Sequence, residues 1–236
     1  MDYGIVIEKI HQELKAYWGK GKVADYIPAL AEVEPKRYGI AIETLDGHSF
    51  QVGDADIRFS IQSISKVFAL AMVTRHLGDR IWKFVGREPS GNPFNSLVQL
   101  EYEHGIPRNP FINAGALVVT DRLMSLYEQP KDAILQFVRS ICGNDDIYYD
   151  KHIARSEREH ADRNMALGYL MKSFGNMEND VEDVVDVYCH QCAIAMSCKE
   201  LTRAFLFLAN HGVNPFNQEK ILTVSQSKRL GALMLT

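Results

Sequence analysis

A serine and a lysine three residues apart, Ser63 and Lys66, form the pair in this chain best suited to carry out chemistry. On a helix, side chains three apart lie on one face with Cβ atoms about 5–6 Å apart, so the two can meet without help from the rest of the chain. A serine becomes a nucleophile when a base takes its proton. A lysine can be that base where burial or a nearby positive field lowers its pKa. Both influences are available here, because Lys66 falls in the first turn of a predicted helix and an apolar run follows it.

The same residues also fit a structural role, in which Ser63 caps the helix and Lys66 points to solvent. The spacing alone does not decide between the two interpretations, since this pattern is common. The context favours chemistry: an extended segment over residues 57–61 precedes the serine, and residues 67–73 have few polar side chains and are expected to be buried.

Two of the four cysteines, Cys189 and Cys192, have a spacing found in metal and redox sites. A zinc site would need a second ligand pair at a suitable distance, and none follows. The stretch 184–198 is predicted to be helix and helix turn. We therefore interpret the cysteines, Cys142 and Cys198 included, as buried free thiols of a reducing compartment.

Composition describes an ordinary globular protein. The 236 residues are 46% hydrophobic and 24% charged, with a net charge of −4, so nothing points to nucleic acid or an anionic membrane as partner. No apolar run reaches the roughly 18 residues of a membrane span, and the first residues lack the pattern of a signal peptide. We expect a cytoplasmic protein.

Periodicity and turn residues predict a β-rich N-terminal part followed by a mostly helical remainder. A hairpin is predicted over 38–44 and 49–53, because Asp46-Gly47 between alternating apolar residues favours a tight turn. A long irregular stretch over 86–109 is of a kind that is often functional. Helices are predicted over residues 5–18, 63–76, 81–85, 113–127 with Asn113 as N-cap, 130–142, 150–174, 181–195, 199–210 and 223–235.

Glu157 and Asn164 would lie two turns apart on one face of the predicted helix over 150–174. A solvated helix face explains such a pair equally well. For Tyr26, spacing alone favours a packing aromatic over a functional residue.

Several strings together resemble one family, the serine-dependent glutaminases, which share the β-lactamase and penicillin-binding-protein fold. The matching strings, in family order, are GKVADYIP (21–28), FSIQSISK (59–66), NPFINAGA (109–116), Ser156-Glu157 with Asn164, MKSFGN (171–176) and Tyr188. The resemblance implies an α/β (α+β) fold with an antiparallel sheet, flanking helices and a mostly helical part. It also implies a single catalytic domain over 1–236, with a sheet-forming part (1–62), a helical part (63–210) and the start of a return to the sheet (211–236).

The resemblance further implies hydrolysis of L-glutamine to L-glutamate and ammonia. Ser63 would be the acylated nucleophile, Lys66 its general base, and Tyr188 a proton relay. The substrate would be held by Ser63 and Tyr188 together with Tyr26, Asn113, Glu157 and Asn164. No metal or organic cofactor is implied, and self-association to a dimer or tetramer is expected.

This chain departs from the family at its end, because relatives continue past Thr236 with another substrate-contacting tyrosine and a glycine-rich strand. If the chain ends at Thr236, that strand is absent and the oxyanion hole is incomplete, and in that case we expect weak or no activity and an exposed sheet edge. Either the product is shortened or the sequence lacks its end.

Two other functions stay open. A β-lactamase or penicillin-binding peptidase would share the fold, but Phe111-Ile112-Asn113 lacks the hydroxyl of their second motif. A non-catalytic binding or regulatory protein is the second alternative.

Overall fold

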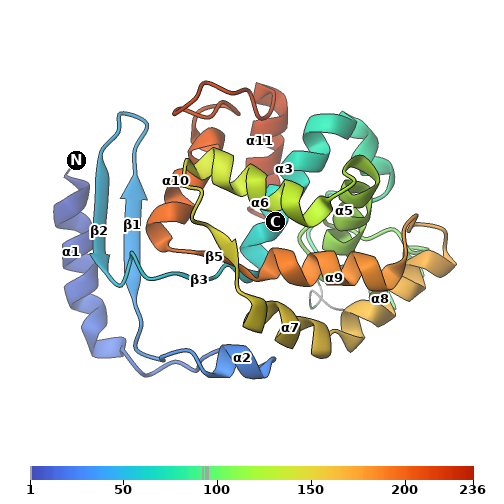
Figure 1. Ribbon diagram of the computed structural model, residues 1–236, viewed down its shortest axis with the longest axis horizontal. Coiled ribbons are helices and arrows are strands. Elements are labelled where there is room, and N and C mark those ends of the chain that lie inside the picture. Colours follow the sequence, from blue (N-terminus) through green and yellow to red (C-terminus); the bar gives the residue numbers. More distant parts are fainter. Residues whose placement is uncertain (1, 92, 94–95) are drawn as a thin grey trace.

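A helix and a β-hairpin form one end of the molecule (Figure 1). The structure, a computed structural model, describes residues 2–91, 93 and 96–236. Helix α1 (Tyr3–Leu14) packs on the hairpin of β1 (Gly39–Glu43) and β2 (Ser49–Gly53) and is followed by the 3₁₀ turn η1 (Lys15–Tyr17). Gly47 lies in the turn with φ +86°, a conformation that glycine adopts without cost. The predicted hairpin is confirmed.

A second small sheet brings distant segments together around Ser63. Its strand order is β3 (Phe59–Ser60), β5 (Ile194–Met196) and β4 (Tyr148–Tyr149), all antiparallel. Strand β3 leads into the turn that carries Ser63, and β5 follows the helix that carries Tyr188. Pairing of β3 with β5 therefore places these two residues side by side, although they are far apart in sequence.

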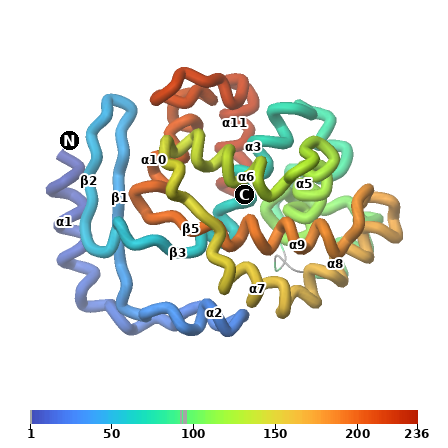
Figure 2. Tube along the Cα trace, in the orientation of Figure 1, coloured from blue at the N-terminus to red at the C-terminus, as the bar shows by residue number. Residues whose placement is uncertain are grey.

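Helices make up the rest of the chain, and Figure 2 shows the trace winding through them. The core helix α3 (Ser65–Leu77) is buried from Ser65 to Thr74 and packs on α5 (Asn113–Leu126). The other α-helices are α2 (Pro28–Ala31), α4 (Leu97–Tyr102), α6 (Pro130–Cys142), α7 (Lys151–Glu159), α8 (Asp162–Ser173), α9 (Val181–Cys192), α10 (Cys198–Ala209) and α11 (Val224–Leu233), with 3₁₀ turns η2 (Gln62–Ile64) and η3 (Gly78–Lys83).

The long helix predicted over 150–174 is wrong, because the chain breaks at His160 and Ala161 into α7 and α8. The backbone of His160 has φ −115° and ψ 25°, and its ring Nδ1 lies 2.9 Å from the Ser156 carbonyl. A side chain that bonds to the carbonyl four residues back competes with the helical hydrogen bond there. Glu157 and Asn164 therefore belong to two helices rather than to one face.

Other predictions also need correction. The helix predicted over 181–195 ends at Cys192, and β5 begins at Ile194 within the stretch expected to be helix and turn. The N-cap of α5 is Ile112, and Asn113 is the first helical residue. The stretch 86–109 contains the short helix α4, while its residues 92, 94 and 95 lie outside the described residues. All four cysteines are free, and Cys198 is half-buried rather than buried.

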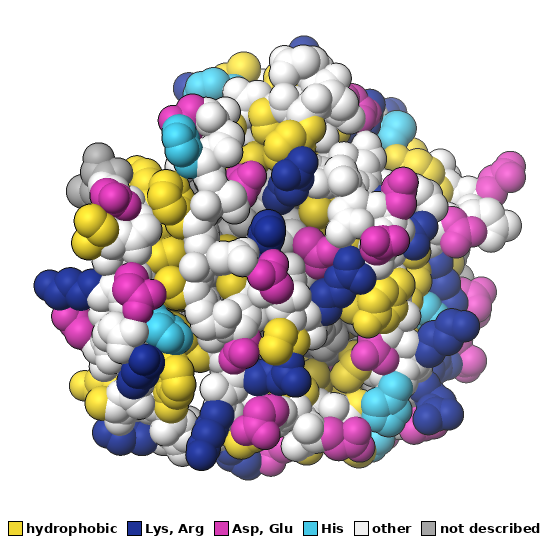
Figure 3. All heavy atoms as spheres, turned by 60° about the vertical axis from the view of Figure 1, so that its left-hand side comes forward, with side chains coloured by type: hydrophobic (Ala, Val, Ile, Leu, Met, Phe, Trp, Pro, Cys, Tyr) yellow, Lys and Arg dark blue, Asp and Glu magenta, His cyan; other side chains and the backbone are white. Residues whose placement is uncertain are grey.

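The end that carries α1 and the hairpin presents charges of both signs. Figure 3 shows Lys and Arg side chains interspersed with Asp and Glu over this face. A surface for nucleic acid would concentrate Lys and Arg instead. Within the described residues, no helix has the length and apolar character needed to cross a membrane.

Candidate active site

Ser63 lies at a strained turn between β3 and α3. Gln62, directly before it, has φ +49°, a left-handed conformation that costs a residue other than glycine about 1–3 kcal/mol. The 3₁₀ turn η2 then holds Ser63 exposed, whereas Ser65 and Lys66 just after it are buried. Backbone strain of this kind persists where the surroundings enforce it, and here it turns one hydroxyl out of the core.

Lys66 is buried without a carboxylate partner within the described residues. Its Nζ donates hydrogen bonds to the Phe111 carbonyl oxygen and to Asn113 Oδ1, both at 2.9 Å. Burial lowers the pKa of Lys66 from 10.5 to about 8. A neutral amine has two N–H bonds and one lone pair. Because two acceptors engage the N–H bonds, the lone pair is left to face another group.

Tyr188 closes the site from α9. Its hydroxyl makes hydrogen-bonding contact with Ser63 and with Cys192, and Lys66 Nζ lies 5.9 Å from the centre of its ring. Burial raises the pKa of Tyr188 well above its ordinary value, so the phenol keeps its proton at neutral pH. Tyr188 is thus a protonated phenol in contact with Ser63.

A buried carboxylate, Glu157, lines the same pocket. Burial raises the pKa of Glu157, and hydrogen bonds from Tyr26 and Gln62 oppose that rise. The Tyr26 hydroxyl lies 3.0 Å from Gln62 Oε1 and 3.4 Å from Glu157 Oε1. Among the described residues Glu157 forms no ion pair. A poorly solvated carboxylate of this kind is suited to receive a cationic ligand group.

Two asparagines join the lysine to the opposite wall. Asn113 accepts from Lys66 through Oδ1 and donates through Nδ2 to Asn164 Oδ1 at 3.1 Å. Both amides are therefore oriented before any ligand enters, which lowers the entropic cost of binding.

These groups line one pocket of about 470 Å³. Its walls are formed by Tyr26, Ile27, Gln62, Ser63, Asn113, Glu157, His160, Arg163, Asn164, Tyr188 and Cys192. Of the seven residues predicted from sequence, six line this pocket. The seventh, Lys66, lines a smaller cavity of about 270 Å³ together with Ser63.

Sequence reasoning missed Gln62, His160, Arg163 and Cys192. Two of them carried a usable signal. Cys192 follows Tyr188 by four residues on helix α9 and so lies on the same face of it, and His160, the residue at which α7 ends, follows Glu157 by three. No pattern in the sequence predicts the positive φ of Gln62.

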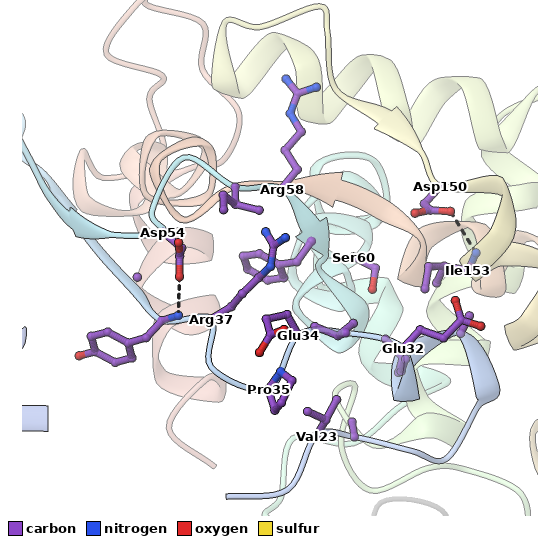
Figure 4. Close-up of a pocket in the computed structure, with 18 of the residues that line it drawn as sticks. Val23, Glu32, Glu34, Pro35, Arg37, Asp54, Arg58, Ser60, Asp150 and Ile153 are labelled. Carbon is purple, nitrogen blue, oxygen red and sulfur yellow. Dashed lines mark hydrogen bonds between the residues drawn. The ribbon is translucent and has the colours of Figure 1, made fainter. Parts of the chain in front are cut away.

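A larger groove of about 960 Å³ lies beside the hairpin and is lined by other residues (Figure 4). Several of its polar groups already have protein partners. Asp54 accepts a hydrogen bond from the Tyr38 backbone N–H at 3.0 Å, and Arg58 is paired with Glu200. The groove lacks a nucleophile beside a base, so the smaller pocket at Ser63 is the candidate active site.

In the part of the chain that the structure describes, no group of side chains forms a metal site. No three or more His, Cys, Asp or Glu side chains are grouped so that they could hold an ion. Burial raises the pKa of Cys192 to about 12 and that of Cys189 still higher, so neither is a ready thiolate ligand.

Comparison with known proteins identifies the family. The family model described as Glutaminase matches residues 21–236. The chain belongs to the glutaminase family. A glutaminase of Paraburkholderia phytofirmans is 57% identical over 236 residues, which is 100% of this chain and 78% of that protein. One of Yersinia pestis is 55% identical over 232 residues, covering 98% of this chain and 75% of that protein.

Solved structures agree with this assignment. A Bacillus subtilis protein described as a probable glutaminase superposes with a TM-score of 0.89 at 28% identity, covering 100% of this chain and 73% of that one. A protein described as the probable glutaminase ybaS gives 0.86 at 31% identity, covering 97% and 76%. The predicted family and the β-lactamase-like α/β fold are confirmed, and a glutaminase-type amidohydrolase (EC 3.5.1.2) is supported.

Proposed function

We propose that the chain hydrolyses L-glutamine to L-glutamate and ammonia through an ester between glutamate and Ser63. The observation that carries the proposal is the exposed Ser63 hydroxyl one helical turn from Lys66, a buried amine whose pKa is lowered to about 8. A lysine in that state is neutral often enough near neutral pH to act as a general base.

The reaction has two steps. Ser63 Oγ attacks the side-chain amide carbon of glutamine while its proton passes to Lys66. The proton then reaches the leaving nitrogen, directly or through Tyr188, and ammonia departs. In the second step water attacks the ester carbon and gives a proton to the same base. That proton then passes to Ser63 Oγ as the ester C–O bond breaks, which frees Ser63 and releases glutamate. The backbone N–H of Ser63 is a donor for the oxyanion, and removal of such a donor costs about 3–4 kcal/mol.

Free glutamine carries an α-ammonium and an α-carboxylate, and burial of either needs paired partners. Glu157 is the partner for the ammonium, because it is the carboxylate that lines the pocket. The amides of Asn113 and Asn164 and the hydroxyl of Tyr26 suit the α-carboxylate and the substrate amide. These assignments make the pocket specific for a free amino acid rather than for a glutamine within a peptide.

Residues 1–236 would act as one catalytic domain, in which the sheet-forming part before residue 63 positions the nucleophile and the helical part supplies the other groups. Self-association to a dimer or tetramer stays a prediction, as does a cytoplasmic location.

The test is release of ammonia and glutamate from L-glutamine by the purified chain. We expect turnover of L-glutamine and none of the β-lactam nitrocefin. Hydrolysis of nitrocefin without that of glutamine would favour the β-lactamase alternative. Glutamine binding without any turnover would favour a binding protein.

The pH dependence follows from Lys66. Below pH about 8 the amine is mostly protonated and cannot accept the serine proton. We therefore expect kcat/KM to rise about tenfold per pH unit below this value and to level off above it. A profile already flat between pH 6 and pH 9 would exclude Lys66 as the base.

Glu157→Gln should weaken substrate binding, because it removes the charge that pairs with the α-ammonium. Truncating one partner of a buried charge pair costs about 2–5 kcal/mol, so we expect KM to rise by about 30-fold or more. The matched control is Glu159→Gln, an exposed residue of the same helix α7 that does not line the pocket. Unchanged KM in Glu157→Gln would remove Glu157 from the binding site.

A further inference from the structure

Cys192 lines the pocket, one helical turn after Tyr188. Residues four apart on a helix share a face, and on α9 both side chains are buried and both line the pocket with Ser63. Figure 1 shows α9 leading directly to β5. Strand β5 pairs with β3, which precedes Ser63 in the sequence. Cys192, the last residue of α9, is therefore held in place by the helix before it and by the paired strand after it.

The thiol links two hydroxyl groups around the nucleophile. It makes hydrogen-bonding contact with Tyr188 and with Ser65, and Tyr188 in turn contacts Ser63. Ser65 Oγ donates a hydrogen bond of 2.8 Å to the carbonyl of Gln62, the strained residue before Ser63. A continuous chain of contacts thus runs from Tyr188 through Cys192 to the backbone that aims the nucleophile.

The thiol stays neutral in this setting. Burial, reinforced by Glu157, raises the pKa of Cys192 to about 12, and Lys66 only partly opposes the rise. A neutral thiol is a poor nucleophile, but it is both a weak donor and a weak acceptor. Cys192 therefore fits a structural contact within the site and not a second covalent centre.

We propose that Cys192 is a positioning residue, which holds the Tyr188 hydroxyl over Ser63 and ties it through Ser65 to the turn at Gln62. Its effect on turnover rests on the proposed function. A 1 Å displacement of a catalytic group is enough to lower a rate strongly, although substrate binding is preserved.

Three variants separate this role from simple packing. Cys192→Ser keeps a hydrogen-bond donor and acceptor. Cys192→Val fills the space but has neither, and Cys192→Ala removes the hydrogen-bonding group and the side-chain volume together. We expect kcat for glutamine to fall about tenfold in the valine and alanine variants with KM within about threefold of the wild type, and serine to restore most of kcat. The control is Cys189→Ala, which removes an equally buried thiol of α9 that does not line the pocket.

Several results would overturn the proposal. These are a wild-type kcat in both Cys192→Val and Cys192→Ala, a loss in Cys192→Ser as large as that in Cys192→Val, or an equal loss in Cys189→Ala. The third result would indicate that any cavity in α9 impairs the enzyme.

A second readout needs no glutamine. Phenylmethylsulfonyl fluoride sulfonylates an activated serine with loss of fluoride, and intact mass follows the rate, with Ser63→Ala as blank. We expect slower labelling in Cys192→Val and recovery in Cys192→Ser. If the wild type is labelled at Ser63 but does not hydrolyse glutamine, the proposed function fails, and the labelling rates still decide the role of Cys192. A wild type that shows neither labelling nor turnover overturns both.

Discussion

Ser63→Ala should abolish ammonia release from L-glutamine while leaving the fold intact. Loss of the nucleophile in a serine hydrolase removes nearly all turnover beyond what binding and the oxyanion donors supply, so we expect kcat to fall by about 10⁴-fold or more. Because the Ser63 side chain is exposed, its truncation should change the free energy of unfolding by less than about 0.5 kcal/mol. Coupled detection of ammonia and thermal unfolding measure the two quantities.

The variant should also retain substrate binding, because Glu157 and the two asparagines do not depend on Ser63 for their hydrogen bonds. Calorimetric titration with L-glutamine would then show binding without turnover. The control is Ser225→Ala, an exposed serine on α11 that is remote in sequence and does not line the pocket. Activity that survives in Ser63→Ala would refute the acyl-enzyme mechanism, whatever else acts in the pocket.

Local sequence pattern was sufficient for elements whose signals are local. The hairpin around Gly47 and helix α6, which begins at Pro130, were both predicted. Strands β4 and β5 were not, because they have two and three residues and exist only through pairing with each other and with β3. The break at His160 was missed because it involves a side chain that competes with the helix for one carbonyl.

The candidate site depended on resemblance more than on spacing. Spacing could place Lys66 one turn from Ser63, since three residues on a helix define the distance. It could not place Tyr26 against Glu157, which is 131 residues away in the chain. It also assigned Asn113 to a helix cap, whereas its amide bridges Lys66 and Asn164. Contacts of this range follow from the packing of the whole chain.

Lys66→Met should abolish turnover and at the same time stabilise the fold at neutral pH. A pKa lowered from 10.5 to about 8 corresponds to a burial cost of about 3 kcal/mol at pH 7, where both folded and unfolded chains carry the charge. Methionine removes that cost and retains most of the side-chain volume. It leaves the Phe111 carbonyl and Asn113 Oδ1 without a donor, and because both residues are only partly buried the two together cost about 2 kcal/mol, the low end of about 1–3 kcal/mol for each.

The net expectation is a gain of about 1 kcal/mol at pH 7, measured from the midpoint of guanidinium unfolding. The direction in which stability changes with pH follows from the linkage between proton binding and folding. Between pH 8 and pH 10.5 the folded lysine loses its proton before the unfolded one does, so the wild type gains stability with rising pH and the burial cost falls to about 1 kcal/mol at pH 10. The advantage of the methionine variant should shrink accordingly.

Taking the difference between wild type and variant at each pH removes the contributions of other groups, such as the buried thiols and tyrosines, which titrate in both proteins. Lys228→Met, at an exposed position of α11, is the control and should change stability little at either pH. If Lys66→Met instead destabilised the chain by several kcal/mol at pH 7 and the difference did not vary with pH, Lys66 would be a fully paired ammonium. A lysine of that kind could not take the proton of Ser63, and the base would have to be sought elsewhere in the pocket.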